Sequence, residues 1–174
     1  MLNTVGLALQ AARWFPDGQK ILLQANEPGK LPRLYGFDIG GAAPKPLTPE
    51  GTFLAGLSPD GKLVAAYGLG DQMFLYSVEG AQPPHPVAGL APGEKFIRWS
   101  GDGQSLFVRS GYLPVKVYRV NLATQARELW KEITPADPTG VTAVDPILIA
   151  PDGKSYVYTA QKNLSNLYLV EGLK

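Results

Sequence analysis

Short runs of apolar residues recur along the whole chain and are separated by turn residues. Apolar and polar side chains alternate within several of these runs, as in Val117-Tyr118-Arg119-Val120. A period of two is typical of β-strands that bury one face. Glycine (20 residues) and proline (16 residues) are spread between the runs. The pattern predicts an all-β protein built from many short strands.

One turn sequence occurs four times. A Pro-Asp-Gly turn, with glycine in place of proline in the third copy, is marked by aspartates at intervals of 43, 42 and 50 residues. The marker aspartates are Asp17, Asp60, Asp102 and Asp152. Proline presets φ, aspartate bonds its own backbone and glycine accepts a positive φ, so the motif suits a tight hairpin. A period of about 40–45 residues is that of one four-stranded propeller blade.

Each turn is followed by an apolar strand, and that strand is followed by a second one centred on a tyrosine. These tyrosines are Tyr35, Tyr76, Tyr118 and Tyr168, and each has an apolar residue two positions later. Candidates for a short fourth strand are 44–47, 86–88 and 127–130. The sequence therefore predicts a single β-propeller domain of four blade repeats with four-stranded antiparallel blades. The repeats are expected at residues 6–48, 49–90, 91–134 and 135–174.

The last repeat has no candidate for its outer strand, while residues 1–5 precede the first repeat without belonging to it. We expect Leu2 to Val5 to supply the missing strand, which would close the ring and cover an open edge. The alternative is an open array, either cut from a larger propeller or completed by a second chain.

These features resemble the WD-like repeats of TolB-type β-propellers, whose signature is a Ser-Pro-Asp-Gly turn followed by a Leu-Tyr-x-Val strand. The turn stands here as Ser58-Pro59-Asp60-Gly61. The ending Asn166-Leu167-Tyr168-Leu169-Val170, with Ile97-Arg98-Trp99-Ser100, is similar to the C-terminal propeller region of bacterial serine/threonine kinases of the eukaryotic type. The resemblance implies a bacterial module that binds proteins or ligands, usually with six or seven blades. The kinase motifs themselves do not occur in the sequence.

Composition and charge narrow the classes of function. The formal net charge is +1, from 16 basic and 15 acidic residues, which gives no electrostatic footprint for nucleic acid. No apolar run reaches the roughly 18 residues of a membrane helix, and residues 1–10 lack the basic region of a secretory signal. We expect a soluble protein of the bacterial cytoplasm or periplasm that binds neither nucleic acid nor a membrane.

Catalytic and metal chemistry find little support. The chain has no cysteine and one histidine, His85, which stands between two prolines. These residues argue against thiolate chemistry and a transition-metal site. Paired carboxylates of the glycosidase type would need two marker aspartates together, but these belong to equivalent turns of different blades. We expect turn capping from them, no cofactor, no metal and no enzymatic activity.

Four residues are candidates for ligand binding. Arg13 and Arg98 each precede a tryptophan on the strand leading into a marker turn, which is the innermost strand of a propeller blade. Guanidinium groups lining the central channel would bind a carboxylate or a peptide terminus, or else bond carbonyls of neighbouring blades. Tyr112 lies in a proline-containing loop, and Asp145 lies in the longest segment between repeats. The tryptophans are expected in the core between blades.

The predicted function is a non-catalytic binding or scaffold module that recognises a peptide, a protein or a small ligand at the propeller face. The alternative is an open half-propeller with a structural role. Such a half-propeller would assemble with another copy, as a homo-oligomer, or complete a larger propeller of a multidomain sensor kinase. Exposed blade faces rich in valine, leucine and tyrosine would favour this alternative.

Overall fold

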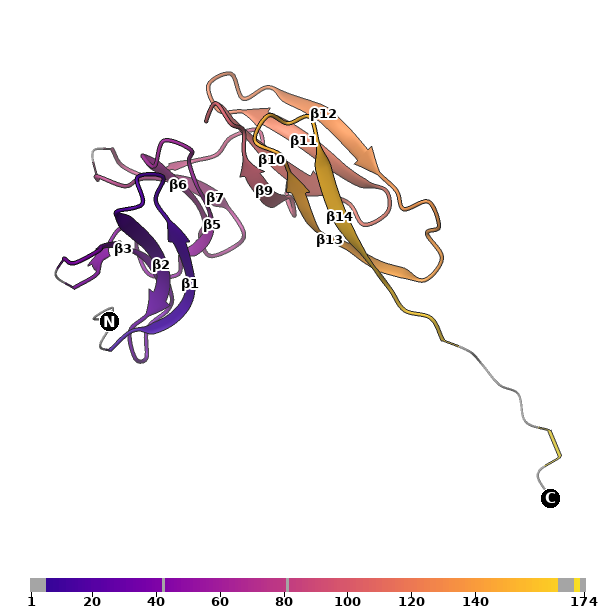
Figure 1. Cartoon of the computed structure of the whole chain (residues 1–174), viewed down its shortest axis with the longest axis horizontal. Helices are drawn as coiled ribbons and strands as arrows, with labels where there is room; N and C mark the ends of the chain where they lie inside the picture. Colours follow the sequence, from indigo (N-terminus) through magenta and orange to yellow (C-terminus); the bar gives the residue numbers. More distant parts are fainter. Residues whose placement is uncertain (1–5, 42, 81, 166–170, 173–174) are drawn as a thin grey trace.

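The computed structural model describes residues 6–41, 43–80, 82–165 and 171–172, and these contain β-strands and no helix (Figure 1). Three sheets have four antiparallel strands each, and one hairpin has two. The first sheet comprises β1 (Ala8–Trp14), β2 (Lys20–Asn26), β3 (Arg33–Asp38) and β4 (Lys45–Pro46). The second comprises β5 (Phe53–Leu57), β6 (Leu63–Tyr67), β7 (Met73–Ser77) and β8 (His85–Pro86). The third comprises β9 (Lys95–Trp99), β10 (Ser105–Ser110), β11 (Val115–Asn121) and β12 (Arg127–Ile133). The hairpin comprises β13 (Val141–Ile149) and β14 (Tyr156–Lys162).

The expected all-β architecture of four-stranded antiparallel sheets is confirmed for the first three repeats, in which strand order follows chain order. The sheets also follow one another in chain order, because β3 contacts β5, β5 contacts β9, and β9 contacts β13. The described residues form an open row of sheets and close no ring (Figure 1). The predicted closing strand at Leu2 to Val5 and the strand around Tyr168 lie outside the described residues. A count of four complete blades therefore stays a prediction.

The four marker turns share one hydrogen-bonding pattern. In each, the glycine N–H donates to the carbonyl oxygen three residues earlier, over 2.9–3.0 Å. The glycines have φ between 66° and 73°, in the left-handed region that other residues rarely adopt. They are Gly18, Gly61, Gly103 and Gly153. The local sequence thus determines the hairpin between the first and second strand of every repeat.

Each marker aspartate caps its own turn, as the sequence predicted. Its carboxylate accepts the backbone N–H two residues later, at 2.8–3.0 Å. In two copies a serine hydroxyl adds a second bond, from Ser58 to Asp60 and from Ser100 to Asp102. These serine bonds, with help from the backbone N–H, lower the pKa of both aspartates. The aspartates are structural groups of the turns.

The hydrophobic core lies between successive sheets. Residues four positions after a marker aspartate face the preceding sheet, and residues five positions after it face the following one. Val64 therefore packs with Leu22 of the first sheet, while Ala65 packs with Leu106 of the third. Of the predicted tyrosines, Tyr35 and Tyr76 are buried and Tyr118 is half-buried. The core is thus a series of interfaces between neighbouring repeats.

Candidate binding site on the innermost strands

The ends of the three innermost strands, β1, β5 and β9, border one hollow of about 430 Å³ near the marker turns. Its walls come from residues that the repeat places at equivalent positions in three sheets. They are Arg13, Trp14, Pro16, Ala55, Gly56, Leu57, Ser58, Pro59, Phe96, Ile97, Arg98 and Trp99. We refer to this hollow as the inner groove.

The structure brings Arg13 and Arg98 to the same groove, although 85 positions separate them. Arg13 is exposed, and among the described residues its Nη1 donates to the neighbouring carbonyl of Ala12, at 2.9 Å. Arg98 donates through Nε to the Trp99 carbonyl at 2.7 Å and through Nη1 to the Ile149 carbonyl on β13. Arg98 therefore links the hairpin to the third sheet. This is the expected alternative in which the guanidinium bonds carbonyls of a neighbouring blade. Neither guanidinium pairs with a carboxylate among the described residues.

The two tryptophans of the inner groove have different surroundings. Trp99 is 3% exposed, and its indole N–H donates to the Gly56 carbonyl on the second sheet at 3.1 Å. Trp14 is 60% exposed, so its assignment to the core between sheets is wrong. The side chain at this repeat position faces the preceding sheet, and no described sheet precedes the first. Trp14 is therefore exposed where it borders the inner groove.

The other two candidates, Tyr112 and Asp145, lie away from the inner groove. The Tyr112 hydroxyl donates to the Val141 carbonyl at the start of β13, over 2.6 Å. Asp145 pairs with Arg109 of β10, with 3.4 Å between a carboxylate oxygen and Nη2. Both contacts join the third sheet to the hairpin, whereas Arg98 binds the opposite end of β13. The four candidate residues thus do not form one site.

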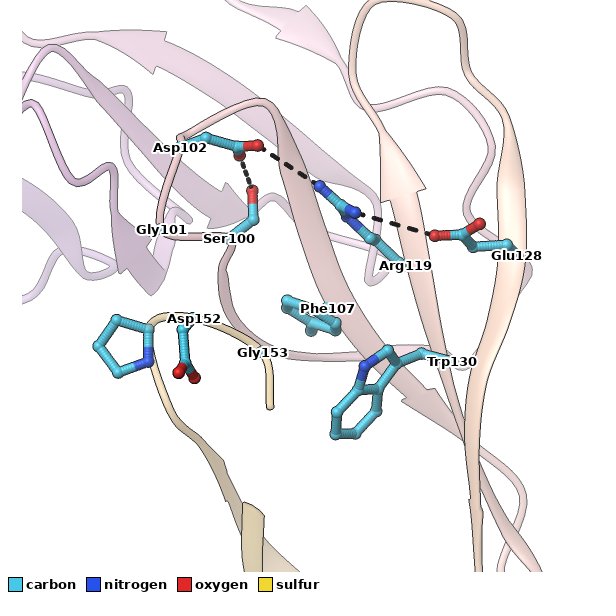
Figure 2. A pocket seen from close by; sticks show the side chains of 10 residues that line it. Ser100, Gly101, Asp102, Phe107, Arg119, Glu128, Trp130, Asp152 and Gly153 are labelled. Carbon is cyan, nitrogen blue, oxygen red and sulfur yellow. Dashed lines mark hydrogen bonds and ion pairs between the residues drawn. The ribbon is translucent and has the colours of Figure 1, made fainter. Parts of the chain in front are cut away.

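A second hollow, of about 380 Å³, was not anticipated from the sequence and lies between the third sheet and the turn of the hairpin (Figure 2). Arg119 stands between Asp102 and Glu128, at 3.5 and 4.0 Å. The Trp130 ring meets Phe107 edge-on, with centroids 5.3 Å apart. We refer to this hollow as the turn hollow. The one sequence signal for it is the glycine that replaces proline in the third marker turn.

Gly101 explains that exception to the repeat. A Cβ at this position would lie 2.5 Å from the carbonyl oxygen of Pro151, in the turn of the hairpin. Real Cβ atoms do not approach an oxygen so closely, so the side chain of proline or alanine would push the two turns apart. The third and fourth turns therefore touch through backbone, on one wall of the turn hollow.

Two carboxylates of the turn hollow have structural partners. Asp102 and Glu128 are both bound to Arg119, and Asp102 also caps its turn. Within the described ranges no three histidine, cysteine, aspartate or glutamate residues are grouped to hold a metal ion. His85 is exposed on β8. No described segment forms a helix long and apolar enough to span a membrane.

Comparison with known proteins identifies the fold. No family model matches the sequence, and no curated protein matches it. Among solved structures, a TolB protein from Agrobacterium tumefaciens superposes with a TM-score of 0.68 at 17% identity, over 92% of this chain and 58% of that one. TolB from Acinetobacter baumannii gives a TM-score of 0.65 at 20% identity, over 92% of this chain and 39% of that one. The chain spans about half the length of these TolB structures, and its all-β sheets have the TolB-like β-propeller fold.

Proposed function

We propose that the protein is a non-catalytic module that binds a protein partner through the inner groove, recognising an acidic peptide segment. A propeller of the TolB-like type suits protein binding, since it presents equivalent strand ends on a rigid scaffold. The observation that carries the proposal is the composition of the groove. It holds two guanidinium groups and an exposed indole, and its lining contains no acidic side chain.

The chemistry of these groups defines the partner. A guanidinium without a carboxylate partner binds a carboxylate through two parallel N–H···O bonds. Arg13 is available for this, because its only described bond goes to the neighbouring carbonyl. The Trp14 indole offers a large apolar surface with an N–H donor, as residues of protein interfaces commonly do. An extended segment with an aspartate or glutamate next to an apolar residue would satisfy both groups.

Fluorescence anisotropy with two labelled peptides tests the proposal. One peptide carries aspartates beside prolines and aromatic residues, and the other carries asparagines at the same positions. We expect the acidic peptide to bind more tightly and Arg13→Glu to lose about tenfold or more in affinity, the value of a charge-assisted hydrogen bond. Lys45→Glu on the outer strand β4 is the matched charge reversal and should bind as wild type. Equal affinity for both peptides, or equal losses in both variants, would reject the inner groove as the site.

A second candidate is the open half-propeller that completes a larger propeller, and one observation favours it. Residues five positions after the marker are buried in the first three repeats, for example Phe107 at 4% exposed. Their equivalent in the hairpin, Val157, is 64% exposed, and its cross-strand neighbour Leu148 is 61% exposed. A following sheet would cover this pair. If the chain is part of a multidomain sensor kinase, the missing sheet would belong to the same kinase. The connection to a kinase rests only on the sequence resemblance described above.

Urea denaturation of two variants tests the second candidate. Val157→Lys should leave the free energy of unfolding within about 0.5 kcal/mol of wild type, since the side chain is exposed. Ala65→Lys, at the equivalent buried position, should unfold the protein or cost several kcal/mol, because it buries an unpaired charge. A large loss from Val157→Lys would mean that this face is already covered, and would reject the idea of a missing sheet.

A further inference from the structure

The aspartates of the four marker turns differ in one hydrogen bond. Each precedes a glycine, and each carboxylate accepts the backbone N–H two residues later. In the second and third turns a serine stands two positions before the aspartate, and its hydroxyl donates to the carboxylate at 2.6 and 2.5 Å. In the first and fourth turns that position holds Phe15 and Ala150, which have no side-chain donor. Two carboxylates therefore have a serine bond that the other two cannot form within their own turns.

An aspartate followed by glycine converts spontaneously to isoaspartate when its side chain is free to react. The glycine nitrogen attacks the side-chain carboxyl carbon, the N–H proton and the carboxyl hydroxyl leave as water, and a five-membered succinimide forms. Water then opens the ring at either carbonyl and gives aspartate or isoaspartate, so one water is released and one is consumed. The attack requires a carboxyl group that is uncharged and able to turn toward the nitrogen. Glycine favours the step because it has no side chain that shields the nitrogen.

The serine bond opposes both requirements. It holds the side chain of Asp60, or of Asp102, toward the serine, and it stabilises the charged carboxylate. The same bond lowers the pKa of both aspartates, so less of the reactive uncharged form is present. The glycine N–H does not distinguish the turns, because it donates to the carbonyl three residues earlier in all four.

Packing around the glycines distinguishes the two turns that lack the serine. A Cβ added at Gly153 would lie 3.6 Å from the Phe107 ring, and the neighbouring Pro151 carbonyl lies against Gly101. At Gly18 no described atom lies within 4 Å of the corresponding position. The first turn thus combines a carboxylate without the serine bond and a backbone that has room to rearrange.

We propose that Asp17, in the first marker turn, is a modification site at which isoaspartate forms spontaneously, while serines protect Asp60 and Asp102. In isoaspartate the main chain passes through the side chain, which adds one methylene group to the turn. The preceding residue, Pro16, lines the inner groove, so the modification changes one wall of the groove. The reaction itself needs only the residues of the turn, and it therefore stands or falls separately from the peptide binding proposed above.

Ageing of the purified chain, followed by peptide mapping, tests the proposal. Chromatography separates isoaspartyl from aspartyl peptides, and ageing in water enriched in oxygen-18 labels the peptides whose succinimide was opened by water. We expect isoaspartate to accumulate at Asp17 about tenfold faster than at Asp60 or Asp102, the factor that a charge-assisted hydrogen bond supplies. The rate at Asp152 should lie between these values. No isoaspartate at Asp17, or equal rates at Asp17 and Asp60, would overturn the proposal.

An exchange of the serine between two turns tests its protective role. Ser58→Ala removes the hydroxyl from the second turn and should raise the rate at Asp60 about tenfold. Ala150→Ser adds a hydroxyl to the fourth turn and should slow the reaction at Asp152. Asp17 is the internal reference in both variants, because its turn is unchanged. An unaltered rate at Asp60 in Ser58→Ala would reject protection by the serine.

Ser58→Thr is the matched control for loosening of the turn. The Ser58 hydroxyl also accepts the Leu63 N–H at 2.9 Å, so its removal weakens the turn as well as freeing the carboxylate. Threonine keeps the hydroxyl, and Asp60 should stay as protected as in wild type. Equal acceleration in Ser58→Thr and Ser58→Ala would show that the fit of the turn, and not the hydroxyl bond, controls the reaction, and would overturn the role given to the serine.

Discussion

The junction between the second and third sheets differs from the junction between the third sheet and the hairpin. In the first, Trp99 is buried and bonds Gly56, where an added Cβ would lie 2.5 Å from the Phe96 ring. Side chains of the third sheet therefore pack directly against the backbone of the second sheet at Gly56. In the second, Trp130 is only half-buried and borders the turn hollow. Each of the two junctions thus contains a tryptophan. It is buried in the first, which we call the sealed junction, and borders a hollow in the second, which we call the open junction.

The segments that lead into the two junctions differ in the same way. Glu94, before β9, has a fully buried side chain that accepts the Ala91 N–H and pairs with Arg127. Asp137, before β13, pairs with Lys162 at 2.6 Å on the exposed surface. Where complete sheets lie on both sides, a buried ion pair anchors the connection. At the junction with the hairpin, which has two described strands, the ion pair between Asp137 and Lys162 is exposed to water and is therefore weakened by salt.

The largest effect expected in a comparison of the two junctions lies at the sealed one. Trp99→Ala removes a buried ring together with its hydrogen bond to Gly56, and should cost about 3–5 kcal/mol of unfolding free energy. The measurement is a urea denaturation curve followed by circular dichroism. A loss below about 1 kcal/mol would show that the second and third sheets are not held together through this side chain.

Trp130→Ala is the matched change at the open junction. The ring meets Phe107 and Tyr156 edge-on, at centroid distances of 5.3 and 5.6 Å, but one side borders the turn hollow. Since the side chain is only partly buried, we expect a cost of about 1–2 kcal/mol in the same assay. If both tryptophan variants lost equal stability, the two junctions would be equally packed and the comparison would fail.

Gly101→Ala tests the close approach of the third and fourth turns. The new Cβ would meet the Pro151 carbonyl, and the resulting shift should cost about 1 kcal/mol, at the low end of overpacking because both turns are at the surface. Gly36→Ala in β3 is the control, since its nearest neighbour is a Leu47 side-chain atom at 3.4 Å. Equal stability of both variants and wild type would mean that the hairpin turn moves freely away from the third sheet.

The local part of the fold could be predicted from the sequence because its causes are local. The marker turns depend on aspartate, serine and glycine within a few residues, and all four have the expected bonds. The repeat also places Arg13 and Arg98 at equivalent strand ends, and both residues line the inner groove, while a binding role for them stays a prediction. The contacts of Tyr112 and Asp145 could not be predicted, because their partners depend on how the hairpin lies against the third sheet.

Trp14 shows why a repeat position does not determine burial. Arg13-Trp14 and Arg98-Trp99 are the same dipeptide at the same distance from a marker turn. Burial of the ring depends on a preceding sheet, which the third sheet has and the first lacks among the described residues. The local sequence therefore specifies which way the indole points, while the neighbouring sheet decides whether it is buried or exposed.

The smallest expected effect concerns pH and the exposed ion pair at the open junction. The hydrogen bond from Lys162 lowers the pKa of Asp137 from 3.8 to about 2, with further bonds from Thr139. Because the folded pKa lies below the unfolded one, the stabilisation is complete above about pH 4 and is lost as the pH falls through about 2. Wild type should therefore melt slightly higher than Asp137→Asn at neutral pH, with the two curves converging in acid. High salt should reduce the difference at neutral pH, since the pair is exposed. The asparagine side chain keeps an acceptor for the Thr139 N–H but has no charge for Lys162, so the comparison isolates the ion pair. An undiminished difference well below pH 2, where the carboxylate is protonated, would show that the ion pair is not the cause.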